Sequence, residues 1–350
     1  NNLVISSGPT YNRENFFSRI FSWFHYSICV FFKLLKISDN TLIFLVSNPP
    51  LLGPVVYFVK LFKNINYVVL VYDIHPDTLI SFNVLKENSI IVNLWKKINR
   101  KVYESSIAVY TIGDVMALRL EQQFDVNKTL LKSVGVIPPW ADTNFMKPIN
   151  KLDNPLAIDF GQDSSITVLY SGNMGISHDI ESMLEASKLL KSKKFIKFLF
   201  IGAGEKWNFA YDYVKKHNLK SVQVLPFQPE DNLPFSMALG DISLVSLDQG
   251  AEGLMVPSKM FYYMAVGSAV IAICEGVNDL ERFVTKINAG IIVKPGCPNT
   301  LAKSILKLAE NKILLNTYKS NSRIGCVEFY SRTSCMNSLI QSLKNINLIR

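Results

Sequence analysis

Short apolar runs rich in β-branched residues alternate with longer amphipathic stretches along most of the chain. Three early runs, 41–47, 67–73 and 106–113, each end in a polar residue or glycine, as buried strands do. The stretches 51–64 and 89–105 between them have the length and periodicity of helices. This βαβ succession predicts a parallel sheet covered on both faces.

Periodicity is lost across residues 136–164, where Pro, Asn and Asp accumulate, and we interpret this segment as an interdomain linker. The pattern then restarts with six predicted strands, at 166–172, 196–204, 222–227, 242–247, 269–274 and 290–294. Helices are predicted at 179–192, 205–218, 230–239, 299–311 and 334–346. We therefore expect two doubly wound α/β domains, at 1–140 and 141–332. The helix in 333–350 can pack on either domain, and a return to the first one is one of these arrangements.

The composition indicates a globular protein attracted to anions. The 350 residues are 49% hydrophobic and 19% charged, and 37 Lys and Arg against 28 Asp and Glu give a net charge of +9. Such a balance suits nucleic acid, phosphorylated small molecules or an anionic lipid surface. Nucleic acid is the weakest of these, because the lysines are scattered and no zinc-ligand spacing or RNA-binding aromatic motif occurs. We predict no nucleic-acid partner.

The cysteines and the N-terminal part bear on the compartment. Five cysteines without a CxxC pair fit a reducing cytosol, with the thiols serving as small buried hydrophobes. The opening NNLVISSGPT does not have the features of a secretory signal.

Residues 16–37 are aromatic and apolar, but Arg19, His25 and Lys33 interrupt the apolar run, which is therefore too short for a membrane-spanning helix. A helix at a membrane interface and a buried core helix remain alternatives.

Ligands of open parallel sheets bind beyond the carboxyl ends of the strands, so residues just after strands are site candidates. Gly172 and Gly175 follow the first strand of the second domain and allow close approach of a ligand. N–H groups ahead of the next helix suit a phosphate. Alternatively, the glycines only form a tight turn, and Asp179 is the helix N-cap with His178 as its neighbour.

Two further positions lie in the second domain. Gly202 and Gly204 form a GxG after a strand, but the third glycine of a dinucleotide fingerprint is absent, which counts against a dehydrogenase. In AEGLMVPSK, Ser258 is the predicted helix cap and Lys259 falls in the first turn. The helix dipole disfavours a cation there unless an anion binds. The alternative is a solvated lysine.

The fourth position lies in the first domain. Asp73 ends a strand, and His75 follows two residues later. A carboxylate and an imidazole at a strand exit suit orientation of a hydroxyl acceptor or proton transfer. Asp77, after a proline, is either part of this site or a helix cap.

The motifs SNPPLLG, YDIHPD, VIPPWAD, YSGNMGISHDIE, FIGAGE, AEGLMVPSK and MAVGSAVIA follow one another between about residues 41 and 332. In this order they resemble glycosyltransferase family 4, whose members are retaining, sugar-nucleotide-dependent enzymes. The resemblance implies the GT-B fold, with two facing Rossmann-like domains and an interdomain cleft. It is strongest to the bacterial branch that builds capsule, colanic-acid-type and O-antigen (lipopolysaccharide) polysaccharides.

The resemblance also implies roles for the strand-exit residues. It places Lys259 against the donor diphosphate and Glu252 on a donor-sugar hydroxyl. The other residues that it assigns to the donor are Gly172, Asn173, Gly175 and His178 at the diphosphate or sugar, Gly202 and Gly204 at the nucleotide, and Gly253 and Ser258 at the sugar and diphosphate.

Several residues depart from the family pattern. Tyr262 stands where many members have a second acid for the ribose, and Asn173 and His178 replace an Arg and a Lys that hold the diphosphate. The interdomain Asn-Trp pair is Pro139-Trp140 here. Family members begin with a strand, a glycine loop and a helix, and we expect this sequence to start after them.

Together these features predict a cytoplasmic transferase of hexosyl or N-acetylhexosaminyl groups, peripherally attached to the inner face of the plasma membrane. Its donor would be a UDP- or GDP-sugar, and its acceptor a polyprenyl-diphosphate-linked glycan. No cofactor and no essential metal are expected. The alternatives are a non-catalytic sugar-nucleotide-binding or assembly protein of a polysaccharide complex and an epimerase of the same architecture.

Overall fold

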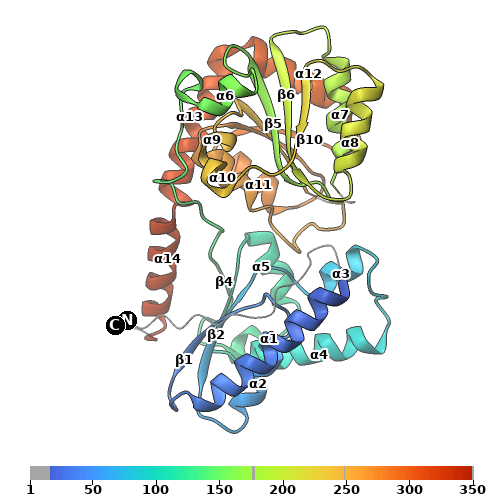
Figure 1. The fold of residues 1–350 in the computed structure, drawn as a ribbon. Coiled ribbons are helices and arrows are strands. Elements are labelled where there is room, and N and C mark those ends of the chain that lie inside the picture. Colours follow the sequence, from blue (N-terminus) through green and yellow to red (C-terminus); the bar gives the residue numbers. More distant parts are fainter. Residues whose placement is uncertain (1–15, 176–177, 248, 349–350) are drawn as a thin grey trace. The chain divides into compact units, whose positions relative to one another are not determined.

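The computed structural model describes residues 16–175, 178–247 and 249–348, except for the side chains of residues 16–20. The chain divides into two units, shown in Figure 1. Unit 1 reaches to Ile137 and includes Asn345–Leu348, and unit 2 spans Pro138–Lys344. Each contains one parallel sheet.

The sheet of unit 1 has four parallel strands in chain order. They are β1 (Leu42–Val46), β2 (Asn66–Val71), β3 (Ala108–Thr111) and β4 (Val134–Val136). The helices of this unit are α1 (Phe16–Lys36), α2 (Leu52–Lys60), α3 (Asp77–Ser81), α4 (Ile90–Glu104) and α5 (Asp114–Glu121), with a 3-10 turn at Val126–Lys128. The three predicted strands are confirmed. β4 and α5 were not predicted, because three strand residues and a two-turn helix carry little periodicity.

Specific contacts position α4 against β2. Ser89 caps α4 by accepting a hydrogen bond from Val92 N at 3.3 Å. At the other end of this helix, the buried Tyr67 hydroxyl of β2 donates to Val102 O at 2.6 Å. β2 is buried on both faces from Tyr67 to Val71, so its uninterrupted apolar run agrees with a central strand.

The sheet of unit 2 has six parallel strands in the order β10-β9-β8-β5-β6-β7. Their bounds are β5 (Ile166–Asn173), β6 (Ile196–Ala203), β7 (Val222–Leu225), β8 (Ile242–Ser246), β9 (Ala269–Ile273) and β10 (Gly290–Val293). All six were predicted. The helices are α6 (Pro155–Asp159), α7 (Ile180–Leu189), α8 (Trp207–Lys216), α9 (Leu233–Met237), α10 (Lys259–Ala265), α11 (Asp279–Lys286), α12 (Pro298–Glu310), α13 (Lys312–Phe329) and α14 (Arg332–Asn345).

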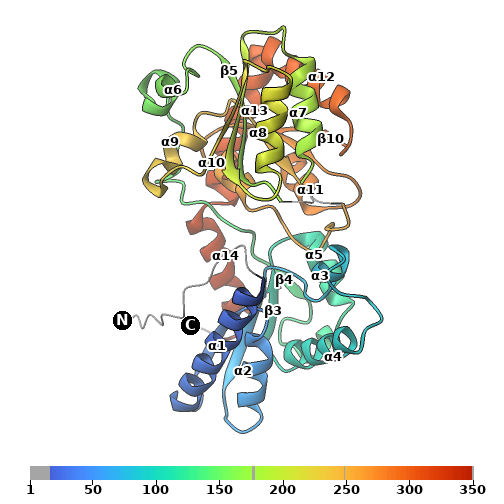
Figure 2. The same ribbon diagram turned by 45° about the vertical axis from the view of Figure 1, so that its right-hand side comes forward.

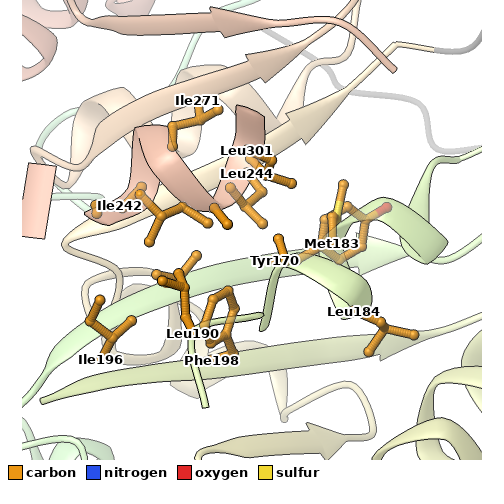
Figure 3. Packing of buried hydrophobic residues seen from close by; sticks show 14 of the residues in the cluster. Tyr170, Met183, Leu184, Leu190, Ile196, Phe198, Ile242, Leu244, Ile271 and Leu301 are labelled. Carbon is orange, nitrogen blue, oxygen red and sulfur yellow. The ribbon is translucent and has the colours of Figure 1, made fainter. Parts of the chain in front are cut away.

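Helices cover both faces of the unit 2 sheet. α7 and α8 lie side by side on one face, where α12 packs against α7, and α10 and α13 pack together on the other face (Figures 1 and 2). Figure 3 shows the core on the α7 side. Tyr170, Phe198, Leu244 and Leu301 there are almost completely buried. Each such side chain contributes roughly 1.5–3 kcal/mol of burial free energy.

The segment 136–164, predicted as a linker without structure, contains two short helical turns. Lys151–Asp153 form a 3-10 turn, and α6 follows with Asn154 as its cap, accepting from Leu156 N at 3.1 Å. Both turns are too short for periodicity to reveal them. From Pro138 onward the segment belongs to unit 2.

Two compositional predictions can be compared with the structure. All five cysteines are unpaired thiols; Cys274, Cys326 and Cys335 are buried as predicted, whereas Cys29 and Cys297 are only partly buried. Among the helices of the described residues, none has both the length and the apolar character to cross a bilayer.

Helix α1 turns an apolar stripe toward solvent. Phe21, Phe24, Ile28, Phe32 and Leu35 recur at helical spacing on one face, and all are exposed, Phe21 to 66%. Phe58 and Phe62 of the neighbouring α2 are exposed as well. The stripe disagrees with the core-helix alternative for residues 16–37. Arg19 belongs to α1, but its side chain lies outside the described residues.

Candidate functional site

The strand order of unit 2 reverses between β5 and β8. From β5 the chain proceeds outward through β6 and β7, and from β8 it proceeds outward on the other side through β9 and β10. The carboxyl ends of β5 and β8 are therefore a topological switch point, where open α/β sheets bind ligands. Gly172 lies at the end of β5, and α10 begins after β8.

A cavity of about 160 Å³ lies at this switch point. Four predicted site residues line it: Gly172, Ser258, Lys259 and Tyr262. Its other lining residues were not predicted and are Ser171, Ile201, Phe227, Gln228, Leu233, Ser236 and Met237. The structure thus brings together the glycine turn and the start of α10, which are nearly ninety positions apart in the sequence.

Lys259, which lines this cavity, lies over the aromatic ring of Tyr170. Its Nζ atom is 3.8 Å from the centroid of the Tyr170 ring, which is buried beneath it. A Cβ atom at Gly172 would lie 3.5 Å from Lys259 Cδ and 3.7 Å from Nζ. Gly172 also has φ +139°, which disfavours any side chain. The lysine is therefore positioned against the β5 backbone, and the solvated-lysine alternative does not describe it.

Tyr263 connects α10 to β5 by hydrogen bonds, and this role was not predicted from the sequence. Its buried hydroxyl accepts a hydrogen bond from Ser171 N at 2.6 Å and donates one to Ser171 O at 2.9 Å. Burial raises the pKa of this phenol above its ordinary value. The sequence feature that could have indicated this role is a tyrosine within an apolar helix, since a buried tyrosine hydroxyl needs a polar partner.

Gly202 and Gly204 are required by backbone packing between β5 and β6. A Cβ atom at Gly202 would lie 1.9 Å from Gly172 O, and one at Gly204 would lie 2.7 Å from Met174 O. The absence of a side chain at these two positions is therefore required first by the neighbouring backbone at the end of β5. Their contact with a nucleotide stays a prediction.

The turn after β5 holds His178 in one orientation. Gly175 N donates to His178 Nδ1 at 3.1 Å, and the Tyr170 hydroxyl, which lies 3.3 Å from Nδ1, donates to Asn173 O at 2.6 Å. This pattern assigns the imidazole proton to Nε2. Asp179 accepts from Ser182 N at 3.1 Å, which confirms it as the cap of α7.

Ser258 and Glu252 differ from their predicted arrangement. Ser258 occupies the N-cap position of α10 in helical conformation, and its side chain makes no cap hydrogen bond, so the prediction of Ser258 as a side-chain cap was wrong. Gly253, with φ +66°, lies in the turn that Leu254 N closes on Ala251 O at 3.0 Å. Glu252 lies beside the loop after β9, its Cγ 3.7 Å from the Cβ position of Gly276, and is not one of the residues that line the Lys259 cavity.

Asp73 and His75 lie together in unit 1, as predicted from their spacing. Both line a cavity of about 20 Å³, room for one water molecule. His75 O accepts from Asn99 Nδ2 at 2.7 Å. Its Nδ1 atom is buried and has no hydrogen-bond partner among the described residues. Asp77 lies outside this cavity, 3.2 Å from Lys96 Nζ, and is the first residue of α3 rather than its cap.

Burial sets the protonation of this pair. It raises the pKa of the Asp73 carboxyl, with His75 acting in the opposite direction. It lowers the pKa of the His75 imidazole, with Asp73 opposing. The imidazole is thus neutral at pH 7 and presents a buried nitrogen to the small cavity. Within the described residues, no group of three His, Cys, Asp or Glu side chains is arranged to hold a metal ion.

Comparison with known proteins adds a family match. Residues 165–311 match the family described as Glycosyl transferases group 1. WbjE of Pseudomonas aeruginosa, named as a glycosyltransferase, is 30% identical over 270 residues, which cover 75% of this chain and 65% of WbjE. WcaI of Escherichia coli K12, named as a colanic acid biosynthesis glycosyl transferase, is 30% identical over 195 residues, or 51% of this chain and 46% of WcaI. The chain therefore spans less than two thirds of either relative.

Solved structures share the fold at low identity. Sucrose-phosphate synthase of Thermosynechococcus elongatus aligns with a TM-score of 0.73 at 15% identity, covering 97% of this chain and 80% of that protein. HepE of Anabaena, solved in complex with UDP, aligns with a TM-score of 0.73 at 14% identity, covering 93% and 84%. At these identities the likeness establishes the fold alone.

Proposed function

We propose that this chain, which belongs to glycosyltransferase family 4, moves a sugar from a nucleotide donor to a lipid-linked glycan in bacterial surface polysaccharide synthesis, with retention of configuration. Its fold is the GT-B fold of the structural neighbours. The observation that carries the proposal is the cavity at the switch point of unit 2, with Lys259 held over Tyr170 beside Gly172. HepE binds UDP in its crystal structure, which supports a nucleotide sugar as donor here.

Lys259 is proposed to stabilise the leaving nucleoside diphosphate. Its ammonium group is positioned before substrate binds, since the Tyr170 ring and the Gly172 backbone fix its surroundings. A preorganised charge of this kind acts on the negative charge that develops as the glycosidic bond to the donor breaks, and removing one typically costs on the order of 3 kcal/mol in barrier.

The neighbouring residues are proposed to position the donor. Tyr262, one helical turn after Lys259, lines the same cavity and is suited to contact the base or ribose. Ser258 offers a hydroxyl at its exposed rim. The Nε2–H of His178 suits a phosphate oxygen. Gly175 and Asn173 shape the turn that holds His178, and Glu252 is assigned to a sugar hydroxyl.

Asp73 and His75 are proposed to orient the acceptor hydroxyl. The neutral imidazole has a buried Nδ1 without a partner among the described residues, and the adjoining carboxyl has a raised pKa. Together they provide a hydrogen-bond acceptor and a group able to exchange a proton.

Calorimetric binding of UDP, GDP and their sugar conjugates tests the donor site. One nucleotide class should bind the wild type, and Lys259→Ala should weaken that binding at least about tenfold, equal to 1.4 kcal/mol. Lys294→Ala is the matched control, because this exposed lysine of unit 2 pairs with Glu275 and lines no part of the Lys259 cavity. Equal weakening in both variants, or no binding by folded wild type, would contradict the proposed donor site.

The exposed stripe of α1 is proposed to adsorb the protein to a membrane. Phe24→Ser combined with Phe32→Ser should lower the fraction that floats with anionic vesicles at least about threefold, because each change removes apolar area that would enter the interface. The control is Phe195→Ser with Phe209→Ser, two exposed phenylalanines of unit 2. A similar loss in the control pair would show that the α1 face has no special part in adsorption.

A further inference from the structure

A second and larger cavity lies within unit 1. It has a volume of about 860 Å³ and opens between α4 and α5, both labelled in Figure 2. Four cationic side chains line it: Lys96, Lys97, Arg100 and Arg119. Asp77 is the only carboxylate among the described residues that line it. The sequence showed the excess of basic residues but not that four of them surround one hollow.

The carboxylate of this cavity is already satisfied. Asp77 Oδ1 lies 3.2 Å from Lys96 Nζ, and Asp77 Oδ2 accepts from Gln123 Nε2 at 3.1 Å. The wall thus carries four cations against one carboxylate among the described residues that line it. Arg100 is steadied by its Nε–H, which donates to Gln123 O at 3.2 Å, so this bond leaves the terminal nitrogens of the guanidinium unused. A planar guanidinium presented in this way matches phosphoryl oxygens.

Large aliphatic side chains adjoin the cations. Ile90, Ile91 and Leu94 are the first, second and fifth residues of α4 and are exposed to 86%, 63% and 56%. Lys97 follows Leu94 by one turn, so the aliphatic stripe leads directly to the cavity wall. Leu118 of α5, also exposed, lines the cavity itself. A contiguous exposed apolar patch of this kind marks an interaction surface.

The two features together favour an anion that carries a hydrocarbon chain. A free nucleotide or sugar phosphate would use the cations but leave the aliphatic residues in water. A nucleic acid would favour aromatic stacking surfaces beside the cations, and the exposed residues here are aliphatic. A phosphoryl group on a lipid uses both, with its charge at the arginines and its chain along the helix.

We infer that the cavity between α4 and α5 binds the diphosphate of a lipid-linked acceptor, while Ile90, Ile91 and Leu94 contact its hydrocarbon chain. The inference rests on the proposed transferase function and assigns the acceptor lipid to a site in unit 1. The predominantly cationic lining of the cavity is matched to the negative charge of a diphosphate ester. The volume also leaves room for the first sugar of the glycan.

Vesicle binding tests the site with adjacent residues of one helix. Arg100→Gln removes a cavity cation, and Lys101→Gln removes an equal charge at the next position, which does not line the cavity. We expect affinity for phosphatidylcholine vesicles carrying undecaprenyl diphosphate to fall about tenfold in Arg100→Gln, the 1.4 kcal/mol of one charge-assisted hydrogen bond. Lys101→Gln should change it less than twofold, and Leu94→Ser should weaken it severalfold.

Three outcomes would overturn the inference. They are equal losses in Arg100→Gln and Lys101→Gln, unchanged binding in Leu94→Ser, and equal wild-type binding to phosphatidylglycerol vesicles of the same charge density. The last measurement is the binding of inorganic diphosphate alone, since tight binding that is unaffected by Leu94→Ser would indicate a free-phosphate site.

Nucleotide calorimetry on the same samples distinguishes a failure of the lipid site from a failure of the proposed donor site. If wild type binds no nucleotide yet passes the vesicle test, the donor assignment fails and the lipid site stands.

Discussion

Gly202→Ala is expected to destabilise unit 2 by more than about 4 kcal/mol and to abolish nucleotide binding. The added Cβ would lie 1.9 Å from Gly172 O and 2.9 Å from Gly172 C, so two backbones must separate rather than one flexible side chain move. Gly172 and Gly202 are paired in the β5–β6 register. The separation would shift the strand end against which Lys259 is positioned, so stability and the donor site should be lost together.

Thermal unfolding and calorimetry of the variant test this, with Gly296→Ala as the matched control. Gly296 has φ +69° and no heavy atom within 4 Å of its Cβ position, so this substitution carries conformational strain without a collision. Strain of that kind costs about 1–2 kcal/mol. Similar unfolding temperatures for Gly202→Ala and Gly296→Ala would show that β5 and β6 tolerate a methyl group between them.

These glycines show what the sequence reveals of a site and what it does not. A GxG after a strand indicated a nucleotide site, which stays a prediction, whereas the close approach that Gly202 makes in the structure is to another strand. The partner is Gly172, thirty positions earlier, and nothing local in the sequence specifies which strand end will lie opposite. Tyr263 was missed for the same reason. Its hydroxyl partner, Ser171, lies on another strand, so the residue looked like one more apolar helix position.

The local hydrophobic pattern was sufficient to predict an element where that element is long or fully buried. The continuous β-branched runs of β5, β8 and β9 identified central strands, since a strand buried on both faces has no polar alternation. It was insufficient for α13, which follows α12 after the single residue Asn311. Asn311 caps α13 by accepting from Leu314 N at 3.0 Å, and its polar surroundings gave no sign of a new helix.

Pattern also left the two alternatives for α1 unresolved, because a stripe facing a core and a stripe facing a bilayer have the same period. Exposure of the stripe to solvent distinguishes them only once neighbouring elements are placed. For the same reason, the sequence did not predict the cationic cavity between α4 and α5. Lys97 and Arg119 are ordinary surface residues in sequence, and only packing of the two helices places them on one hollow.

Asp241→Ala should lower the free energy of unfolding of unit 2 by about 3–5 kcal/mol, because it leaves two buried or half-buried lysines facing each other. Lys151 Nζ lies 2.5 Å from Asp241 Oδ2, and Lys319 Nζ lies 2.8 Å from Oδ1. Oδ2 also accepts from Thr167 N at 3.0 Å, at the start of β5. The carboxylate thus joins the segment before α6, the central strand and α13.

The pH dependence distinguishes this ion cluster from a packing defect. Burial alone would raise the pKa of Asp241, but the ammonium groups of Lys151 and Lys319 hold it below its ordinary value. A depressed pKa means that the stabilisation is fully present above the unfolded-state value of about 4 and is lost as pH falls through the folded value. The free energies of unfolding of wild type and of Asp241→Asn, measured with urea, should therefore differ most at pH 7 and converge in acid. Asp212→Ala, on the exposed face of α8, should match wild type throughout. A wild-type advantage over Asp241→Asn that persisted undiminished below the folded pKa would mean that shape and hydrogen bonding, rather than charge, stabilise this junction.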